Sequence, residues 1–207
     1  MYDSILKDFS LEDKFVINCY PYGSRVYGTN SFKSDYDFII VVDNSQHDKD
    51  SMDSSYHNYN ATIYSENSFN EQLNNHKIGA FECISLDKEL CLKHTKSFNI
   101  KINKNILRES ISEKASHSFV KAKKKFEVEK DKNIYIAKKS LFHSLRIINF
   151  GIQIAKNNKI TDFSSSNYLW EEISNFESED WNFYKSKYQK VFNELISEFR
   201  LLAPKKI

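Results

Sequence analysis

The sequence predicts a mixed α/β protein, with a small sheet and its helices in the first half and a helical bundle in the second. Residues 1–100 alternate short apolar runs with polar loops, whereas from about residue 103 apolar side chains recur at helical spacing. The 207 residues are 40% hydrophobic, enough for one two-layer domain or for a smaller domain with a helical appendage. We expect one domain over residues 1–100 and a helical domain over residues 101–207 packed on it.

The first apolar run, Lys14 to Tyr20, is predicted to be a strand that Pro21 ends. Gly23 and Ser24 follow at the turn, where a glycine lets the backbone come close to a ligand. Backbone N–H groups and a serine hydroxyl at the start of a short helical turn can cradle a phosphate. Arg25 would add a charged contact, so the turn predicts a phosphate-binding site.

The second run, Phe38 to Val42, is short, apolar and rich in β-branched residues, which favours a buried strand. Asp35 and Asp37 open this run and would point to one face, roughly 7 Å apart, with Tyr36 on the other face. Two like charges so placed resist ionising together unless a cation lies between them. Oxygen ligands of this kind suit Mg²⁺ (or Mn²⁺), so the pair predicts a metal site beside the phosphate-binding turn.

The remaining elements follow from periodicity. Residues 43–56 carry Ser, Asp, Lys and His without an apolar pattern and are predicted to be a mobile loop with solvated acidic residues. Three later apolar stripes predict amphipathic helices. Their members are Ile111, Ala115, Phe119, Ala122 and Phe126; Ile134, Ala137, Leu141, Leu145, Ile148, Ile152 and Ala155; and Trp181, Tyr184, Tyr188, Val191, Leu195, Phe199 and Leu202.

Gly23-Ser24, ten residues, then Asp35-Tyr36-Asp37 resembles the motif of the nucleotidyltransferase superfamily related to DNA polymerase β. The surrounding GSRVYGT and SDYD are similar to a group of predicted bacterial and viral nucleotidyltransferases. The resemblance extends more loosely over residues 15–155. It takes in a strand at 61–65 that runs into a helix ending near residue 75, then residues 81–84, and a later helix with His143 and Arg146.

This resemblance implies a nucleotidyltransferase fold, with a mixed sheet flanked by helices and followed by a helical bundle. It implies transfer of a nucleoside monophosphate from a nucleoside triphosphate such as ATP to a hydroxyl acceptor, an RNA end, a protein or a small molecule. Ser24 and its neighbours would hold the triphosphate, and Asp35 and Asp37 would ligate Mg²⁺. The helical part commonly closes over the nucleotide in such enzymes, which suggests nucleotide or acceptor contacts for three residues of one later helix: Lys139, His143 and Arg146.

One position departs from the pattern of the superfamily. Its members usually carry a third acidic residue on the strand after Asp-x-Asp, and the matching position here is Asn60. An asparagine ligates weakly through its carbonyl oxygen but cannot take a proton, and general-base assistance is worth about 10²–10⁴-fold. If the strand has a different register, another carboxylate can take the place of the third acidic residue. The candidates are Asp53, Glu66 and Glu82.

Composition limits the other function classes. The net charge of +2 gives no electrostatic argument for nucleic acid. The three cysteines have no ligand-like spacing, which indicates buried or incidental thiols in a reducing compartment. No stretch is apolar enough to cross a membrane. We therefore expect a cytoplasmic protein without a membrane partner. Lys121 and Lys123-Lys124-Lys125 form a basic cluster for which a solvated helix face is the default explanation and a phosphate contact the alternative.

Three functional hypotheses remain open. The first is an active nucleotidyltransferase, which the retained Gly23-Ser24 and both aspartates favour. The second is a nucleotide-binding module of the same fold that is catalytically weak or inactive, which Asn60 favours. The third is an interaction protein of the antitoxin or defence type. The acceptor, the preferred base and the oligomeric state are not determined by the sequence.

Overall fold

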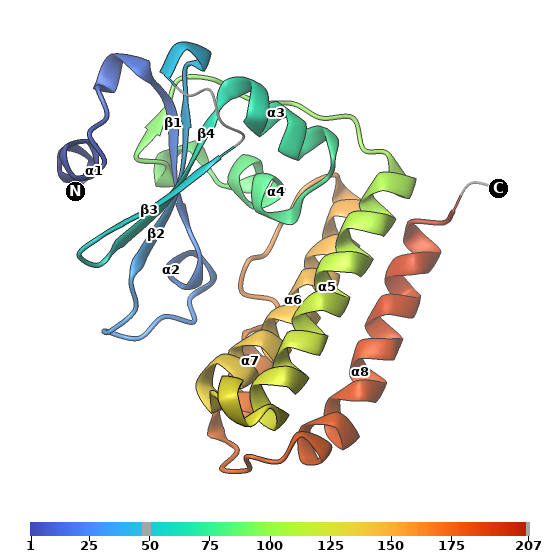
Figure 1. The fold of residues 1–207 in the computed structure, drawn as a ribbon. Coiled ribbons are helices and arrows are strands. Elements are labelled where there is room, and N and C mark those ends of the chain that lie inside the picture. Colours follow the sequence, from blue (N-terminus) through green and yellow to red (C-terminus); the bar gives the residue numbers. More distant parts are fainter. Residues whose placement is uncertain (47–50, 206–207) are drawn as a thin grey trace. The chain divides into compact units, whose positions relative to one another are not determined.

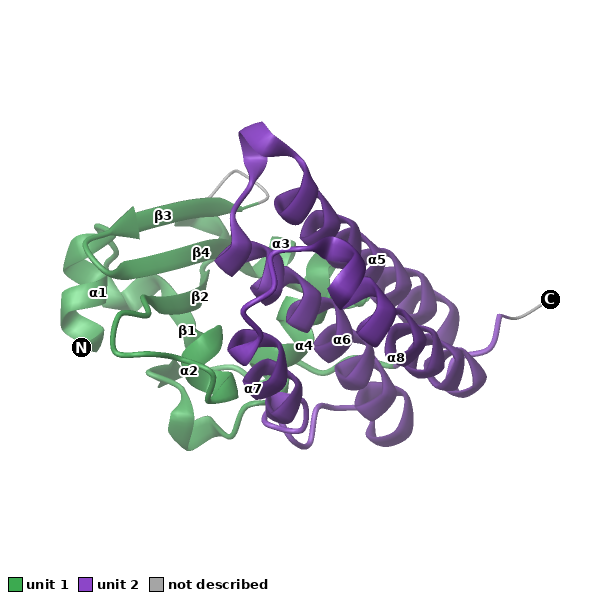
Figure 2. Cartoon of the chain, turned by 90° about the horizontal axis from the view of Figure 1, so that it is seen from below, with its two compact units in different colours: residues 1–101 green, residues 102–207 purple. Residues whose placement is uncertain are grey.

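The structure is a computed structural model that describes residues 1–46 and 51–205. The chain forms two compact units, Met1–Lys101 and Ile102–Ile207 (Figure 2). The first contains a mixed sheet with flanking helices and the second consists of helices, so the predicted fold class is confirmed. The packing of the second domain on the first stays a prediction.

The sheet of the first unit has five strands within the described residues, in the order β3-β4-β2-β1-β5. Strands β2 and β4 are parallel, and the pairs β1–β2, β1–β5 and β3–β4 are antiparallel. The strand bounds are β1 (Val16–Tyr22), β2 (Tyr36–Val42), β3 (Met52–Tyr56), β4 (Tyr59–Ser65) and β5 (Lys93–His94).

Helices cover both faces of this sheet (Figure 1). On one face Phe38 and Ile40 of β2 pack in a core with Ile5 of α1 (Tyr2–Asp8). On the other, Ile39 and Val41 pack with residues of α3 (Glu66–Asn74) and α4 (Ile78–Ser85). Strand β2 is therefore buried on both faces, which explains why its sequence is a continuous apolar run. Short helical segments complete the unit: α2 (Ser24–Tyr27), η1 (Asp13–Phe15), η2 (Asn44–Gln46) and η3 (Lys88–Leu90).

The end of the first strand differs from the prediction. Pro21 does not end the first strand, because β1 continues to Tyr22 with Pro21 opposite Phe38. Strand β5 pairs with β1 at Asn18 and Cys19, and among the described residues no strand pairs with this edge of β1 at Pro21, so a proline is tolerated there.

The segment predicted as a mobile loop, residues 43–56, contains β3 and the short helix η2. Strand β3 is an edge strand with four of its five residues exposed, so it lacks the apolar alternation that marks a half-buried strand. Residues 47–50 of the predicted loop lie outside the described residues.

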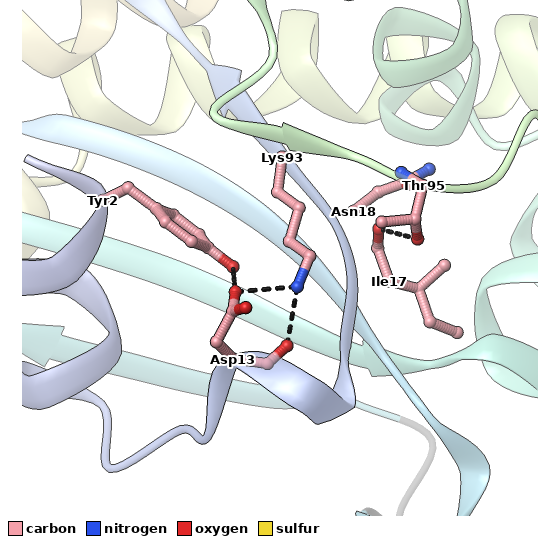
Figure 3. Close-up of polar contacts among 6 residues, drawn as sticks. All are labelled: Tyr2, Asp13, Ile17, Asn18, Lys93 and Thr95. Atoms are coloured by element: carbon pink, nitrogen blue, oxygen red, sulfur yellow. Dashed lines mark hydrogen bonds and ion pairs between the residues drawn. The ribbon is translucent and has the colours of Figure 1, made fainter.

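Polar contacts attach the short strand β5 and the N-terminal segment to β1 (Figure 3). Lys93 donates to the Asp13 carboxylate at 2.7 Å, and Tyr2 donates to the same oxygen at 2.7 Å. The buried Asn18 carboxamide accepts from the backbone N–H of Thr95 and Lys96, at 2.9 and 3.1 Å. These bonds hold β1 on the side away from β2.

The second unit contains the three predicted helices. They are α5 (Lys104–Glu127), α6 (Ile134–Asn157) and α8 (Trp181–Leu202); α7 (Asn167–Asn175) was not anticipated, and η4 (Glu129–Asp131) lies between α5 and α6. Gly151 of α6 marks a point of close packing, because a Cβ there would lie 2.7 Å from Ile111 of α5 and 3.1 Å from Phe199 of α8. In the part of the chain that the structure describes, no helix is both long and apolar enough to span a membrane. The three cysteines are free thiols, and Cys19 and Cys83 are buried.

Candidate functional site

The structure brings the two halves of the predicted motif into direct contact. Strands β1 and β2 pair with Tyr22 opposite Asp37, so the turn after β1 lies beside the start of β2. Gly23 has φ +78° and ψ −153°, and a Cβ at this position would lie 2.4 Å from Oδ2 of Asp37. Both the backbone conformation and the space demand glycine. The turn predicted to bind phosphate and one predicted metal ligand therefore lie side by side.

Ser24 is the first residue of the four-residue helix α2, and a buried hydrogen bond attaches this helix to α4. The Tyr27 hydroxyl donates to Oε2 of Glu82 at 2.5 Å, and Glu82, on α4, is 2% exposed. Gly28 ends the helix in the left-handed region, at φ 78° and ψ 22°. The contact between Tyr27 and Glu82 gives Glu82 a positioning role under the turn, which the sequence did not reveal because 55 residues separate the two.

Arg25 holds the segment that carries Asp35. Its guanidinium lies 3.7 Å from the centre of the Tyr36 ring and donates to the carbonyl oxygens of Ser34 and Asp35, at 2.6 and 3.2 Å. Asp35 itself is exposed and directly precedes β2, while Asp37 is half-buried. Arg25 was predicted as a phosphate contact. The structure shows it bound to the loop, and the phosphate contact stays a prediction.

Asn60 lies directly beside Asp37. The parallel strands β2 and β4 pair these two residues, and the Asn60 amide nitrogen donates to Oδ1 of Asp37 at 3.1 Å. The Asn60 carbonyl oxygen in turn accepts from the Ser55 hydroxyl at 2.8 Å. The chain of bonds from Ser55 through Asn60 to Asp37 fixes the carboxylate on the side opposite Gly23.

Each of the three alternative carboxylates, Asp53, Glu66 and Glu82, has another partner. Glu82 accepts the hydrogen bond from Tyr27 described above. Asp53 accepts from Thr62 at 2.7 Å and lies on β3, two strands from Asp37, which is about 10 Å at ordinary strand spacing. Glu66 follows the far end of β4 and pairs with Lys96. Within residues 1–46 and 51–205, no three His, Cys, Asp or Glu side chains come together to hold a metal ion.

The structure places the Asp37 carboxylate beside the Asn60 amide, and Asp35, two residues earlier in the chain, would supply the second carboxylate. Mg²⁺ is usually held by one or two carboxylates together with substrate phosphates and water. Asp35 and Asp37 fit an ion of this kind that arrives with a phosphorylated ligand. They do not form a site that would hold the ion by protein ligands alone.

Lys139, His143 and Arg146 all lie on α6, in the second unit. Arg146 donates from Nη2 to Nδ1 of His143 at 2.7 Å, and the Arg146 side chain is buried. Burial, and then the positive charge of Arg146, lower the pKa of His143 well below its ordinary value. A contact between these residues and a nucleotide stays a prediction.

Comparison with solved structures gives distant likenesses only for the fold. No family model matches the sequence, and no curated protein matches it. The chain is similar to a crystal structure described as a nucleotidyltransferase-like protein from Exiguobacterium sibiricum, with 11% identity and a TM-score of 0.33 over 97% of this chain and 72% of that one. Because the sequence identity and the TM-score are this low, the likeness carries no argument about function, and the function is argued from the site itself.

Proposed function

We propose that this chain is a nucleotidyltransferase that uses Mg²⁺ to transfer a nucleoside monophosphate from a nucleoside triphosphate to a hydroxyl acceptor. The observation that carries the proposal is the contact between Gly23 and the Asp37 carboxylate. It joins a glycine-serine turn to a carboxylate at the start of a buried strand. A scaffold alone gains nothing from a second carboxylate two residues away, since like charges at this spacing repel.

Each residue of the site has a role in this reaction. Ser24 and the backbone N–H groups at the start of α2 bind the phosphates of the triphosphate. Asp35 and Asp37 hold the metal ion, which when bound neutralises phosphate charge and orients the reacting groups. The acceptor hydroxyl gives its proton to solvent water, and its oxygen forms a bond to the α-phosphorus as the bond to pyrophosphate breaks. Positioning and charge neutralisation supply most of the rate in such transfers.

The hydrogen bond from Asn60 to Asp37 favours a second candidate, a nucleotide-binding protein that does not catalyse. At this position an amide donates to the carboxylate instead of adding a carboxylate of its own. Loss of a general base slows proton removal by about 10²–10⁴-fold and leaves binding intact. Such a protein would act by recognising a nucleotide or a partner, as an antitoxin or defence protein does.

Transfer of a label separates the two candidates. The full chain is incubated with α-phosphate-labelled triphosphates and Mg²⁺ or Mn²⁺, together with an oligoribonucleotide or with the protein itself as acceptor. Release of pyrophosphate with label on an acceptor, lost in Asp35→Asn/Asp37→Asn, supports the enzyme. Nucleotide binding without any transfer by the wild-type chain supports the second candidate.

A further inference from the structure

Phe32 is the most exposed of the large apolar side chains in the described part of the chain, at 90%. It lies in the loop of residues 28–35, which joins α2 to β2 and extends past the start of that strand (Figure 1). Asp35 follows three residues later, so the Cα atoms of Phe32 and Asp35 are at most about 11 Å apart. A single exposed apolar residue is common on protein surfaces, so exposure alone indicates no function. The position of Phe32 near the candidate site and the structure of its loop distinguish it from such residues.

The loop around Phe32 contains a hydrogen-bonded turn. The backbone N–H of Ser34 donates to the Ser31 carbonyl oxygen at 3.1 Å, which makes Phe32 and Lys33 the two central residues of a β-turn. The Ser31 N–H donates to Oγ of Ser34 at 2.9 Å, and the Lys33 N–H donates to Oγ of Ser31 at 3.3 Å. Turns usually consist of Gly, Pro, Asn, Asp and Ser, each of which favours the turn conformation. A phenylalanine contributes no such effect, so the turn does not explain why Phe32 is present.

Hydrogen bonds attach both ends of the loop to α2. At one end, the Arg25 guanidinium donates to the carbonyl oxygens of Ser34 and Asp35, at 2.6 and 3.2 Å. At the other end, the Thr29 N–H donates to the Ser24 carbonyl oxygen at 3.0 Å. The turn is therefore held beside the helix whose first residue is the predicted phosphate ligand. A ligand that contacts it meets a preorganised surface, so binding there costs less conformational entropy than the ordering of a flexible segment would.

The Phe32 ring is open to a flat ligand. Nζ of Lys33 lies over the ring, 5.5 Å from its centre, and the 90% exposure of Phe32 leaves the opposite face to solvent. Within residues 1–46 and 51–205, Lys33 forms no ion pair. An exposed aromatic ring beside a positive charge suits an unpaired nucleobase that carries a phosphate, because every base has a π-face and every phosphate is negative.

We propose that Phe32 is a stacking platform for a nucleobase bound at the candidate site, with Lys33 facing the phosphate of the same nucleotide. This inference rests on the proposed function and adds the part of the ligand that the site recognises besides its phosphates. The base belongs either to the nucleoside triphosphate or to an unpaired end of a nucleic acid that serves as the acceptor, and both present the same flat ring. Because stacking tolerates any base, Phe32 adds affinity without selecting one base over another.

Isothermal titration of the full chain in Mg²⁺ tests the proposal by comparing the wild type with Phe32→Ala and Phe32→Leu. Phe32→Leu keeps an apolar side chain and removes the flat ring. Two ligands contain a base: an ATP analogue with a methylene α–β bridge, which cannot be transferred, and a single-stranded oligoribonucleotide with hydroxyl ends. We expect both variants to bind a base-containing ligand about 5- to 150-fold more weakly, the range that follows from the loss of one base–aromatic stack.

Two controls separate stacking from other effects. Tripolyphosphate has the phosphates without the base, so the Phe32 variants should bind it as the wild type does. Leu90→Ala removes another exposed apolar side chain of the first unit, which is 59% exposed, and should bind all three ligands as the wild type does. The melting temperatures of all the variants should match that of the wild type, because each substituted side chain is exposed.

The two base-containing ligands distinguish the source of the base. Weaker binding of the ATP analogue assigns the base to the triphosphate, and weaker binding of the oligoribonucleotide assigns it to the acceptor; either result supports the platform. If Phe32→Ala binds both ligands as tightly as the wild type does, the platform is overturned, while Mg²⁺-dependent binding of the ATP analogue leaves the proposed transfer reaction standing. A wild-type chain that binds neither ligand would overturn the platform and the proposed function together.

A second readout reports the stacking itself. Phe32→Trp keeps a flat ring, so it should bind the base-containing ligand at least as tightly as the wild type does, and a base stacked on the indole should quench its fluorescence. The chain already contains two tryptophans, and the wild type titrated in the same way gives their background. Fluorescence of Phe32→Trp that changes no more than this background at saturation would contradict the proposal.

Discussion

Replacing Gly23 by alanine should damage both the stability of the fold and the binding site, through two separate effects. The backbone at Gly23 has φ +78° and ψ −153°, a region that costs a residue with a Cβ about 1–3 kcal/mol. The new methyl group would also lie 2.4 Å from Oδ2 and 3.1 Å from Cγ of Asp37. The carboxylate must therefore turn away, although Asn60 holds its other oxygen. We expect the free energy of unfolding to fall by about 1–3 kcal/mol and metal-dependent nucleotide binding to be lost.

Chemical denaturation measures the first effect, and titration with Mg²⁺ and a nucleoside triphosphate measures the second. Gly79→Ala on α4 is the matched control, because its Cβ meets the Tyr22 hydroxyl at an ordinary 3.4 Å and a helical alanine is favourable by up to about 1 kcal/mol. The control should retain stability and binding. A Gly23→Ala protein with the stability and the nucleotide affinity of the wild type would refute the account of the turn.

Three further substitutions test other parts of the structure. Asn60→Asp places a third carboxylate beside Asp37, so we expect a lower melting temperature in EDTA, recovery in Mg²⁺ and faster label transfer; equal melting in both buffers would contradict this. Gly151→Ala should cost about 1–3 kcal/mol in denaturant titration, because its Cβ would overlap Ile111 at 2.7 Å. The pKa of His143 is lowered in the folded chain, whereas in the unfolded chain it has its ordinary value of 6.5. Below pH 6.5 the unfolded chain therefore binds one more proton than the folded chain. The contribution of His143 to stability is complete above pH 6.5 and falls as the pH decreases. The slope contributed by this group is at most about 1.4 kcal/mol per pH unit, and His143→Gln should flatten it in melts from pH 7.5 to 5.

Elements with a strong pattern of burial were predictable from the sequence. Strand β2 is buried on both faces and reads as a continuous apolar block. Helices α5 and α8 bury one stripe each, and α6 buries its predicted stripe together with most of the residues around it. Strand β3 was missed because an exposed edge strand has no buried face to impose alternation. The prediction that Pro21 ends the first strand was wrong. A proline fits in a strand where one edge of that strand has no hydrogen-bonded neighbour, and only the order of the strands in the sheet shows where this is so.

The proximity of Gly23, Asp37 and Asn60 was predictable from the sequence, and the contacts around them were less so. The position of Asn60 beside Asp37 agrees with the pattern of the resemblance, since parallel pairing aligns the two strands. The positioning roles of Arg25 and Glu82 were not visible. Arg25 acts on backbone carbonyl oxygens, which carry no sequence signal, and Glu82 meets Tyr27 across 55 residues.

The measurement that tests the central claim most directly is isothermal titration of the full chain with each nucleoside triphosphate, with Mg²⁺ and with EDTA. The titration is repeated on Asp35→Ala/Asp37→Ala. The site described for Gly23, Asp35 and Asp37 predicts a Mg²⁺-dependent component of binding in the wild type that disappears in the double variant. Absence of that component from the wild type, or its survival in the double variant, would contradict the assignment of these carboxylates to a metal–nucleotide site.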